Sequence, residues 1–393
     1  MLSVPRVVRV ISRLNVGGPA IQALTLTRLL EPLGYETLLV RGVEGPREGT
    51  MDDLAAQLGV SPRLLRSLRR EFGPHDARAL LAMTGTLRTV KPHILHTHMA
   101  KAGAIGRLAA MLAGDAAPPV RIHTFHGHVL TGYFSAPQAR FFASIERGLA
   151  KSTTRLVAVS DEVREDLARL RIAPREQIQT IPLGFDLAPF DGTPAESAER
   201  RRALRAELGI APNARVVTLV ARLVPIKRVD RFLRVATHVA DLEDVHFLVV
   251  GDGELRSELQ TSGVARALTP RLVWTGIRRD MPSVVSASDV VALSSDNEGT
   301  PVSLIEAQAG GVPVVGTNVG GVAGAVGDGS SGILVRPKDE AAFAEALRRL
   351  LLDRDLAARM GAAGREHVRE RFSIDRLVRD IDVLYRRLLA KVR

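Results

Sequence analysis

Short runs rich in β-branched residues alternate with longer amphipathic stretches along almost all of this 393-residue chain. Such alternation is typical of strand–helix units whose strands form parallel sheets. Two series of strands are predicted, first at 7–11, 36–40, 93–98, 120–125, 155–160 and 178–182, and then at 215–221, 245–251, 271–276, 289–295, 312–317 and 332–335. Helices are predicted between them, for example over 19–31, 101–113 and 161–170. The pattern predicts an α/β protein.

A segment rich in Gly, Pro and Asp, residues 184–200, separates the two strand series. We therefore predict an N-terminal domain over 1–183, a linker region over 184–214 and a C-terminal domain over 215–371. Residues 372–393 carry an apolar stripe at helical spacing, which predicts a C-terminal helix that packs back toward the N-terminal domain. Two doubly wound, Rossmann-like domains that face each other would bind ligands at the carboxyl ends of their strands.

Composition and charge exclude several classes of protein. The chain is 46% hydrophobic and 25% charged, as globular proteins are, and no apolar run reaches the roughly 18–20 residues of a transmembrane helix. The N-terminus shows no signal-peptide pattern, so a cytoplasmic protein is expected as the default. The lack of cysteine rules out disulfides and thiolate chemistry but does not by itself indicate a compartment. A net charge of +11 favours anionic partners such as nucleotides or anionic lipid, while 4% aromatic residues argue against nucleic acid.

Two glycine-containing segments follow predicted strands, where ligands of such folds bind. In "NVGGPAIQ", Gly17 and Gly18 precede a predicted helix whose exposed amides would attract an anion. In "VVGDGELR", Gly251 and Gly253 would allow close approach of a nucleotide, although a plain tight turn fits equally well. Both segments are candidate binding loops.

The segment "ARLVPIKR" places Arg222 and Lys227 in one loop after a predicted strand. A guanidinium and an ammonium directed at one crevice are the groups that a diphosphate requires. Further along, "EGTPVSLIEAQAGG" places Glu298 outside a predicted helix and Glu306 inside it, with a Gly-Thr-Pro turn between them. A carboxylate in a first helical turn offsets the macrodipole by about 0.3–1 kcal/mol, but that does not explain the glutamate in the loop.

Six of the ten histidines gather near the ends of two predicted strands, namely His93, His96, His98, His123, His126 and His128. The H-x-H spacing puts two rings on one face of a strand, which could be a metal site. No cysteine and no HExxH helix supports that interpretation. We favour one histidine that contacts substrate, with His96 and His123 as core histidines whose hydrogen bonds are satisfied.

The segment "SPRLLRSLRREF" is predicted to form a basic amphipathic helix over residues 61–72. Its apolar residues fall on one helical face and its arginines elsewhere. Such a helix either lies on an anionic membrane or is simply solvated.

Taken together, these segments resemble the retaining glycosyltransferases of family 4, which have the GT-B fold. The resemblance runs from about residue 7 to the final helix, and it rests on the order of "RLNVGGPAIQ", "HTHMAKAGAIGRLAA", "HTFHGHVLTGYFS", "IPLGFD", "ARLVPIKR", "VVGDGEL" and "EGTPVSLIEAQAGGVPVVGTNVGG". The last of these resembles the E-x7-E signature of that family. The resemblance implies a UDP- or GDP-sugar donor held mainly by the C-terminal domain, an acceptor held mainly by the N-terminal one, and no cofactor or metal.

The resemblance also implies roles for the two glutamates and for the turn between them. Glu298 would contact hydroxyls of the transferring sugar, and Glu306 would accept from both ribose hydroxyls. The diphosphate would pass the helix start between them and meet residues of the turn and the first helical amides, namely Gly299, Thr300, Val302 and Ser303.

The catalytic group implied by the resemblance consists of Arg222, Lys227, Glu298 and His126. Arg222 and Lys227 would stabilise the leaving diphosphate in place of a metal ion, and His126 would lie near the reacting centre of the sugar. No residue is assigned as a nucleophile or general base, because the acceptor is thought to attack on the face of the leaving group.

Two positions depart from the family pattern. Arg228 follows the lysine where the family usually has Gly, and Gly324 stands where "VGGxxE" usually has Glu. Two further functions share this fold: an NDP-sugar 2-epimerase, and a non-catalytic protein that binds nucleotide sugars. The basic segment 61–72 predicts a lipid-linked or membrane-proximal acceptor, at the inner face of the membrane.

Overall fold

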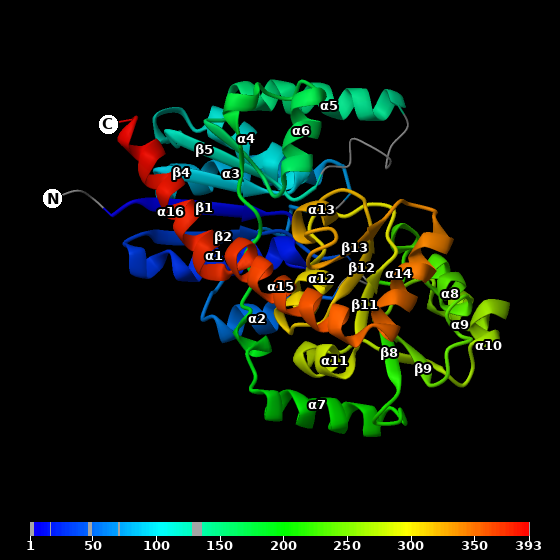
Figure 1. Ribbon diagram of the computed structural model, residues 1–393. Coiled ribbons are helices and arrows are strands. Elements are labelled where there is room, and N and C mark those ends of the chain that lie inside the picture. Colours follow the sequence, from blue (N-terminus) through cyan, green and yellow to red (C-terminus); the bar gives the residue numbers. More distant parts are fainter. Residues whose placement is uncertain (1–3, 16, 46–48, 70, 128–135, 393) are drawn as a thin grey trace. The chain divides into compact units, whose positions relative to one another are not determined.

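The computed structural model describes residues 4–15, 17–45, 49–69, 71–127 and 136–392, which form two compact units (Figure 1). The first unit contains the chain up to Phe185 together with Ile374–Arg393, and the second contains Asp186–Ser373. Each has a parallel sheet with helices on both faces. The prediction of two Rossmann-like α/β domains is therefore confirmed.

The sheet of the first unit has the strand order β3-β2-β1-β4-β5-β6-β7, and all its described pairs are parallel. Its strands are β1 (Arg6–Ile11), β2 (Glu36–Arg41), β3 (Arg63–Leu64), β4 (Ile94–His98), β5 (Val120–Phe125), β6 (Arg155–Ala158) and β7 (Ile178–Thr180). The chain order reverses between β1 and β4. In doubly wound sheets, the carboxyl ends of the two strands at such a reversal are where ligands bind.

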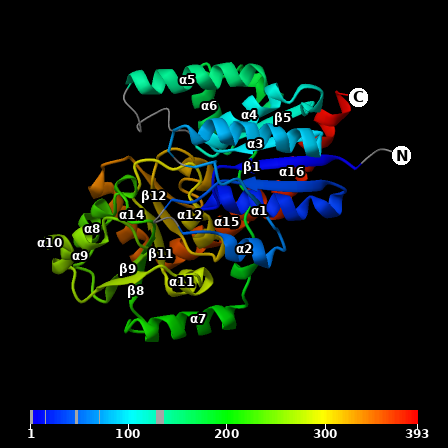
Figure 2. The same cartoon turned by 180° about the vertical axis from the view of Figure 1, so that it is seen from behind.

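Alternating side chains of β1 face two separate cores. Val7 packs with residues of α1 and α16, whereas Val8 and Val10 pack with residues of α3 and α4 on the opposite face. Figure 2 shows helices α3 and α4 on one side of β1 and α1 on the other. The helices of this unit are α1 (Gly18–Leu29), α2 (Asp52–Gln57), α3 (His75–Val90), α4 (Ala100–Leu112), α5 (Ala136–Lys151), α6 (Asp161–Arg169) and α16 (Ile374–Ala390). The C-terminal helix is thus part of the core of the first unit.

The sheet of the second unit has the parallel order β10-β9-β8-β11-β12-β13 and reverses between β8 and β11. Its strands are β8 (Arg215–Val220), β9 (Val245–Val250), β10 (Leu272–Gly276), β11 (Val290–Leu293), β12 (Val314–Thr317) and β13 (Gly332–Val335). All the strands predicted from the sequence are present, within a few residues at their ends. The two-residue strand β3 was not predicted.

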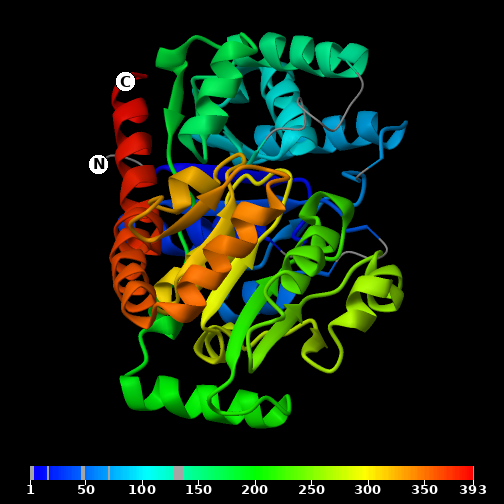
Figure 3. The same ribbon diagram turned by 45° about the vertical axis from the view of Figure 1, so that its right-hand side comes forward.

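The helices of the second unit cover both faces of its sheet. Residues of α8 and α14 pack on one face and residues of α7 and α11 on the other, and Figure 3 shows α14, in orange, lying across the strands. The helices are α7 (Pro194–Glu207), α8 (Val229–Thr237), α9 (Arg256–Thr261), α10 (Gly263–Ala267), α11 (Met281–Ala287), α12 (Val302–Ala309), α13 (Val322–Ala325), α14 (Glu340–Leu352) and α15 (Arg354–Phe372).

The region 184–214, which the sequence predicted to be a linker, contains helix α7 instead. This helix begins with a capping box, in which Thr193 Oγ1 accepts from Glu196 N at 3.2 Å and Glu196 Oε2 accepts from Thr193 N at 2.7 Å. Leu204 is buried against α11. Pro194, one of the residues that suggested a linker, is the first residue of this helix, which belongs to the second unit.

The prediction of a basic helix over residues 61–72 is wrong. In the described part of this stretch, Arg63 and Leu64 pair with β2 at the edge of the first sheet, and Leu68 is buried in the core with Met83. Pairing with the sheet edge and burial of Leu68 outweigh the helical spacing of the leucines. Arg70 lies outside the described residues, and the membrane surface inferred from this helix loses its basis.

Candidate functional site

Two loops of the second unit carry five of the predicted site residues, namely Arg222, Lys227, Glu298, Gly299 and Thr300. The loop of residues 221–228 follows β8 and the loop of residues 294–301 follows β11. Because β8 and β11 are neighbours at the point where the strand order reverses, their loops meet at one edge of the sheet.

Lys227 and Glu298 are brought together by these loops. Lys227 Nζ lies 2.5 Å from Glu298 Oε1, and Ser295 Oγ donates to the same oxygen at 2.6 Å. The Glu298 side chain is only 8% exposed. Removing the ammonium would leave a nearly buried carboxylate with one donor, which is unfavourable. The pair holds a cation and an anion at the mouth of the site, and Ser295 is a contact that sequence reasoning missed.

Arg222 lies in the same loop as Lys227. The residue is exposed, and in the described part of the chain no group accepts a hydrogen bond from its guanidinium. The backbone beside it is fixed, since Leu223 is buried and its amide donates to Asp252 O at 2.9 Å. Arg222 therefore presents a free cation from a rigid support.

The start of helix α12 lies just beyond Glu298. Val302 N donates to Thr300 O at 3.0 Å and Leu304 N donates to Pro301 O at 3.1 Å. No group in the described part of the chain accepts a hydrogen bond from the amide of Ser303. This amide and the positive end of the helix are available to an anion.

Glu306 lies one turn further into α12, and no described group donates a hydrogen bond to its carboxylate. Burial raises the pKa of Glu306 to about 7. A half-buried carboxylate without donors is unfavourable in the free protein. Its arrangement suits a ligand that brings hydroxyl donors of its own.

Two glycines of the segment 318–321 support the backbone of the loop that carries Glu298. Gly320 has a φ of +49°, and a Cβ atom there would lie 2.0 Å from Glu298 O. Gly321 N donates to the same oxygen at 2.8 Å. The sequence analysis assigned no role to these two glycines, although both lie in the "EGTPVSLIEAQAGGVPVVGTNVGG" segment. They pack behind the turn that contains Gly299 and Thr300.

Gly251 and Gly253 do not face open space. A Cβ atom at Gly251 would lie 2.0 Å from Ala221 O, and one at Gly253 would lie 2.5 Å from Leu223 O. Both glycines therefore let the end of β9 pack against the loop of Arg222. This close packing explains why both positions are glycine. Nucleotide binding at this turn stays a prediction.

In the first unit, Gly17 and Gly18 lie at the start of α1, after β1. Gly17 has a φ of +152°, and its carbonyl accepts from the amides of Ala20 and Ile21 at 3.2 and 3.3 Å. Val16 lies outside the described residues. The glycine pair sits at the carboxyl end of β1, beside the switch point with β4.

His126 follows β5 and pairs with His98 at the end of β4. His98 Nδ1 and His126 Nε2 are 3.0 Å apart and share one proton as a hydrogen bond. Burial lowers the pKa of His126 to about 3, so the ring is neutral at physiological pH. His98 is a partner that sequence reasoning did not assign.

His96 and His123 lie in the core of the first unit. His96 bonds to Tyr385 and to Thr124, both at 2.7 Å, and His123 Nδ1 bonds to Thr97 at 2.9 Å. Nε2 of His123 has no partner, so only His96 is fully satisfied. No group of three His, Asp or Glu residues in the described chain could hold a metal ion; His128 lies outside that part.

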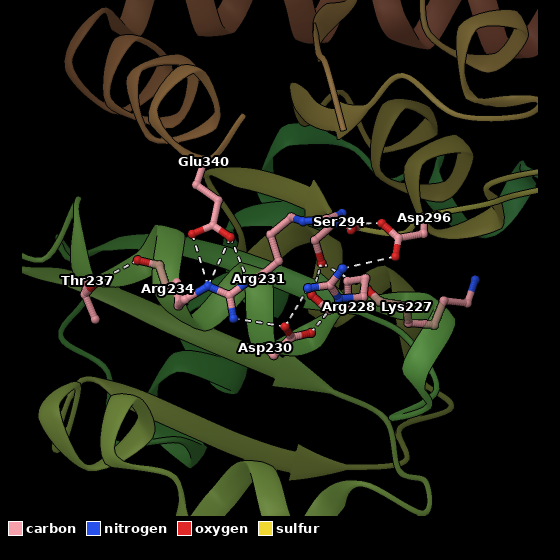
Figure 4. Close-up of polar contacts among 9 residues, drawn as sticks. All are labelled: Lys227, Arg228, Asp230, Arg231, Arg234, Thr237, Ser294, Asp296 and Glu340. Carbon is pink, nitrogen blue, oxygen red and sulfur yellow. Dashed lines mark hydrogen bonds and ion pairs between the residues drawn. The ribbon is translucent and has the colours of Figure 1, made fainter. Parts of the chain in front are cut away.

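Arg228, which stands where the resemblance led us to expect glycine, adopts the backbone conformation of a glycine. Its φ and ψ are 48° and 47°, in the left-handed region. Its guanidinium binds Asp230 and Asp296, contacts that the sequence did not predict (Figure 4). The loop thus keeps the shape that glycine would allow. At the second departure, Gly324 lies within α13 and brings no carboxylate.

Both halves of the chain match known protein families. Residues 16–189 match the family described as "Glycosyltransferase Family 4", and residues 200–367 match "Glycosyl transferases group 1".

Two curated relatives are similar over most of the chain. The chain is 31% identical over 355 residues to the UDP-Gal:alpha-D-GlcNAc-diphosphoundecaprenol alpha-1,3-galactosyltransferase of Escherichia coli. The aligned region covers 89% of each protein. It is 32% identical over 357 residues to the D-inositol 3-phosphate glycosyltransferase of Nocardia farcinica, covering 84% of this chain and 71% of that one.

Solved structures share the fold. Anabaena HepE, crystallised with UDP and glucose, superposes with a TM-score of 0.80 at 20% identity, over 97% of this chain and 99% of that one. Sucrose-phosphate synthase from Thermosynechococcus elongatus gives a TM-score of 0.79 at 21% identity, over 98% and 100%. At these identities the likeness shows the GT-B fold alone.

Proposed function

The chain belongs to the family 4 glycosyltransferases, and from this we propose that it transfers a sugar from a nucleotide-diphosphate donor to an acceptor hydroxyl with retention of configuration. The observation that carries the proposal is the arrangement around α12. An ion pair of Lys227 and Glu298 lies before the helix, a free amide at Ser303 lies in its first turn, and an unpaired carboxylate of Glu306 lies one turn further. These groups match, in order, a sugar, a diphosphate and a ribose.

The leaving diphosphate is stabilised by cations of the protein in this proposal, without a metal ion. Lys227 and Arg222 supply the two positive charges, and the positive end of α12 adds to them. Arg222 has no partner to give up, whereas Lys227 must share or leave Glu298 when the diphosphate binds. Glu298 then accepts from hydroxyls of the sugar, and Glu306 from both ribose hydroxyls.

The transfer step needs no enzymic nucleophile. The acceptor oxygen forms a bond to the anomeric carbon on the face from which the diphosphate leaves, and the bond from that carbon to the phosphate oxygen breaks. The proton of the acceptor hydroxyl passes to the leaving phosphate oxygen. His126 is neutral and takes part as a hydrogen-bonding group near the reacting carbon, not as an acid.

A UDP-sugar donor and a lipid-linked acceptor are proposed from the relatives. The Escherichia coli relative is described as using UDP-Gal and a diphosphoundecaprenol acceptor, and HepE was crystallised with UDP. The proposal does not name the sugar, because relatives of similar identity are named for different substrates, GlcNAc-diphosphoundecaprenol and D-inositol 3-phosphate.

A contact with the inner face of the membrane is proposed through α5 in place of the segment 61–72. On this helix Phe141 and Ile145 are 62% and 38% exposed, and Arg140 and Arg147 are exposed beside them. The one acidic residue of the helix, Glu146, turns inward and binds Arg107 at 2.8 Å. No described helix is both long and apolar enough to cross a membrane. The outer face of α5 is therefore apolar and cationic, which suits anionic lipid.

Replacing Phe141 by serine is expected to lower binding to vesicles that contain anionic phosphatidylglycerol by several-fold, because this exposed ring supplies much of the apolar contact area. Co-sedimentation at low salt measures the effect. Val383→Ser is the matched control, since Val383 is a 63% exposed apolar residue on α16 of the same unit. Equal binding of the wild type to neutral and anionic vesicles would argue against this surface.

The donor is tested by a thermal-shift panel of UDP- and GDP-sugars and free nucleotides in EDTA. A nucleotide sugar at 100 times its Kd should stabilise the fold by about 2.7 kcal/mol. The expected result is a shift without metal, followed by release of the nucleoside diphosphate when an acceptor is added. A shift that needs a divalent cation would contradict the cationic-pair account, and donor consumption without acceptor or nucleotide release would indicate an epimerase.

A further inference from the structure

Arg228 and Arg231 converge on one carboxylate in the loop after β11. Arg228 Nη1 lies 3.1 Å from Asp296 Oδ2, and Arg231 Nη2 lies 2.7 Å from Asp296 Oδ1. Arg231 is 1% exposed and also donates to Ser294 O at 2.7 Å, so it is part of the fold itself. Arg228, by contrast, is 28% exposed and reaches Asp296 from the opposite loop.

Backbone groups join the same two loops. Ser294 Oγ donates to the carbonyls of Lys227 and Arg228 at 3.1 and 2.9 Å, and Asp296 N donates to Ile226 O at 2.9 Å. In the first loop these contacts involve the backbone of Lys227 itself. In the second loop they involve Asp296, which lies two positions before Glu298. The relative placement of the two loops is therefore determined by contacts around residue 228.

The side chain of Arg228 holds a backbone conformation that is unfavourable for it. With φ at +48°, the position favours glycine, and an arginine is retained there only if its side chain contributes. The guanidinium contacts Asp230 with Nε and Nη2 at 3.0 and 2.9 Å, and Asp296 with Nη1. These hydrogen bonds, with Asp230 first, hold the pKa of Arg228 above its ordinary value.

Asp230 extends the network into helices α8 and α14. Arg234 Nη1 lies 2.9 Å from Asp230 Oδ2, and Arg234 Nη2 lies 2.7 Å from Glu340 Oε1. In Figure 4 the side chain of Lys227 extends away from this network and makes no contact within it. The network therefore fixes the backbone of residue 227 and leaves its ammonium available.

From this geometry we propose that Arg228 is a positioning residue that keeps Lys227 directed at the diphosphate. In the free protein the ammonium of Lys227 lies against Glu298 at 2.5 Å. When a diphosphate draws the ammonium away, the Arg228–Asp296 contact keeps the two loops together, so only the lysine side chain moves. The inference rests on the proposed function, because it assigns the diphosphate to Lys227.

The test compares affinities for UDP, measured by calorimetry, and for uridine, measured by ligand-observed NMR. Arg228→Gly removes the guanidinium and keeps the left-handed backbone, so the variant should fold. We expect its affinity for UDP to fall about tenfold, while its affinity for uridine is unchanged. Arg228→Lys restores a charge without the planar fork and should recover only part of the loss. Arg348→Ala, which breaks an exposed pair with Asp241 on the same unit, is the control and should change neither affinity.

A double-mutant cycle separates positioning from a general structural effect. If Arg228 acts through Lys227, Arg228→Gly should cause no further loss of UDP affinity in the Lys227→Ala background. The inference would be overturned, with the proposed function left standing, by any of three results. These are wild-type UDP affinity in Arg228→Gly, an equal loss of affinity for uridine, or additive losses in the double variant. If the wild type binds neither UDP nor GDP, the proposed function fails and the inference falls with it.

Discussion

Lys227→Ala is expected to lower kcat for sugar transfer by about 10²–10³-fold, which corresponds to about 2.7–4 kcal/mol of barrier. The ammonium stabilises charge that develops on the diphosphate as the bond to the sugar breaks. Because this charge is largest in the transition state, kcat should fall more than donor binding does. Steady-state kinetics with saturating donor and acceptor measure the change.

The same variant disturbs the free protein, because among the described residues Ser295 is then the one remaining donor to the Glu298 carboxylate. Arg222→Ala gives the cleaner comparison. Arg222 has no side-chain partner in the described chain, so its loss should change the free energy of unfolding by less than about 0.5 kcal/mol while kcat still falls. Lys391→Ala, at an exposed site near the C-terminus, is the control for a lost positive charge. Unchanged kcat in both Lys227→Ala and Arg222→Ala would contradict the leaving-group role.

Glu306→Gln is expected to abolish the thermal shift caused by a nucleotide and, at the same time, to stabilise the free protein above pH 7. The pKa of Glu306 is raised from its ordinary 4.5 to about 7 by burial. Below pH 4.5 the group is protonated in both the folded and the unfolded state, and it has no effect on stability. As pH rises from 4.5 to 7, the unfolded state ionises first, so the wild type loses stability over this window.

Glutamine cannot ionise, so the variant avoids this loss. With a partly exposed group the gain is roughly 1–3 kcal/mol at pH 8, and it should vanish near pH 4.5. Urea unfolding of both proteins at several pH values measures it. Glu345→Gln, at an exposed position of α14, is the control and should show no such dependence. Equal stability of wild type and Glu306→Gln at pH 8, together with an intact nucleotide shift, would show that Glu306 is not the ribose ligand.

These two variants separate two uses of charge in one site. Lys227 and Glu298 neutralise each other in the free protein, so the ion pair adds order to the loops before any ligand binds. No described residue pairs with the Glu306 carboxylate, and because burial raises its pKa to about 7, its ionisation is expected to destabilise the free protein at neutral pH. A site that binds hydroxyl donors benefits from a carboxylate that accepts no hydrogen bond in the free protein. Keeping such a carboxylate costs stability, which is why Glu306→Gln is expected to be more stable.

Local pattern in the sequence determined much of the fold. The predicted strands are all present because short β-branched runs between turn residues are encoded within a few positions. The candidate donor site also followed from the sequence, since Arg222 and Lys227 lie in the loop after β8, and Glu298 and Glu306 lie in the loop and the helix after β11. Pattern failed at residues 61–72, where leucines at helical spacing are used by a sheet edge and a core instead.

The contacts within the site were decided by tertiary structure. Lys227 and Glu298 are 71 residues apart, Arg228 and Asp296 are 68 apart, and His98 and His126 are 28 apart. Each pair meets because the sheet places two strands side by side, and no local spacing encodes that neighbour relation. The left-handed backbone of Arg228 and the packing of Gly251 against Ala221 likewise depend on distant partners. The sequence by itself determined which residues stand at the strand ends, and strand order in three dimensions decided which of them touch.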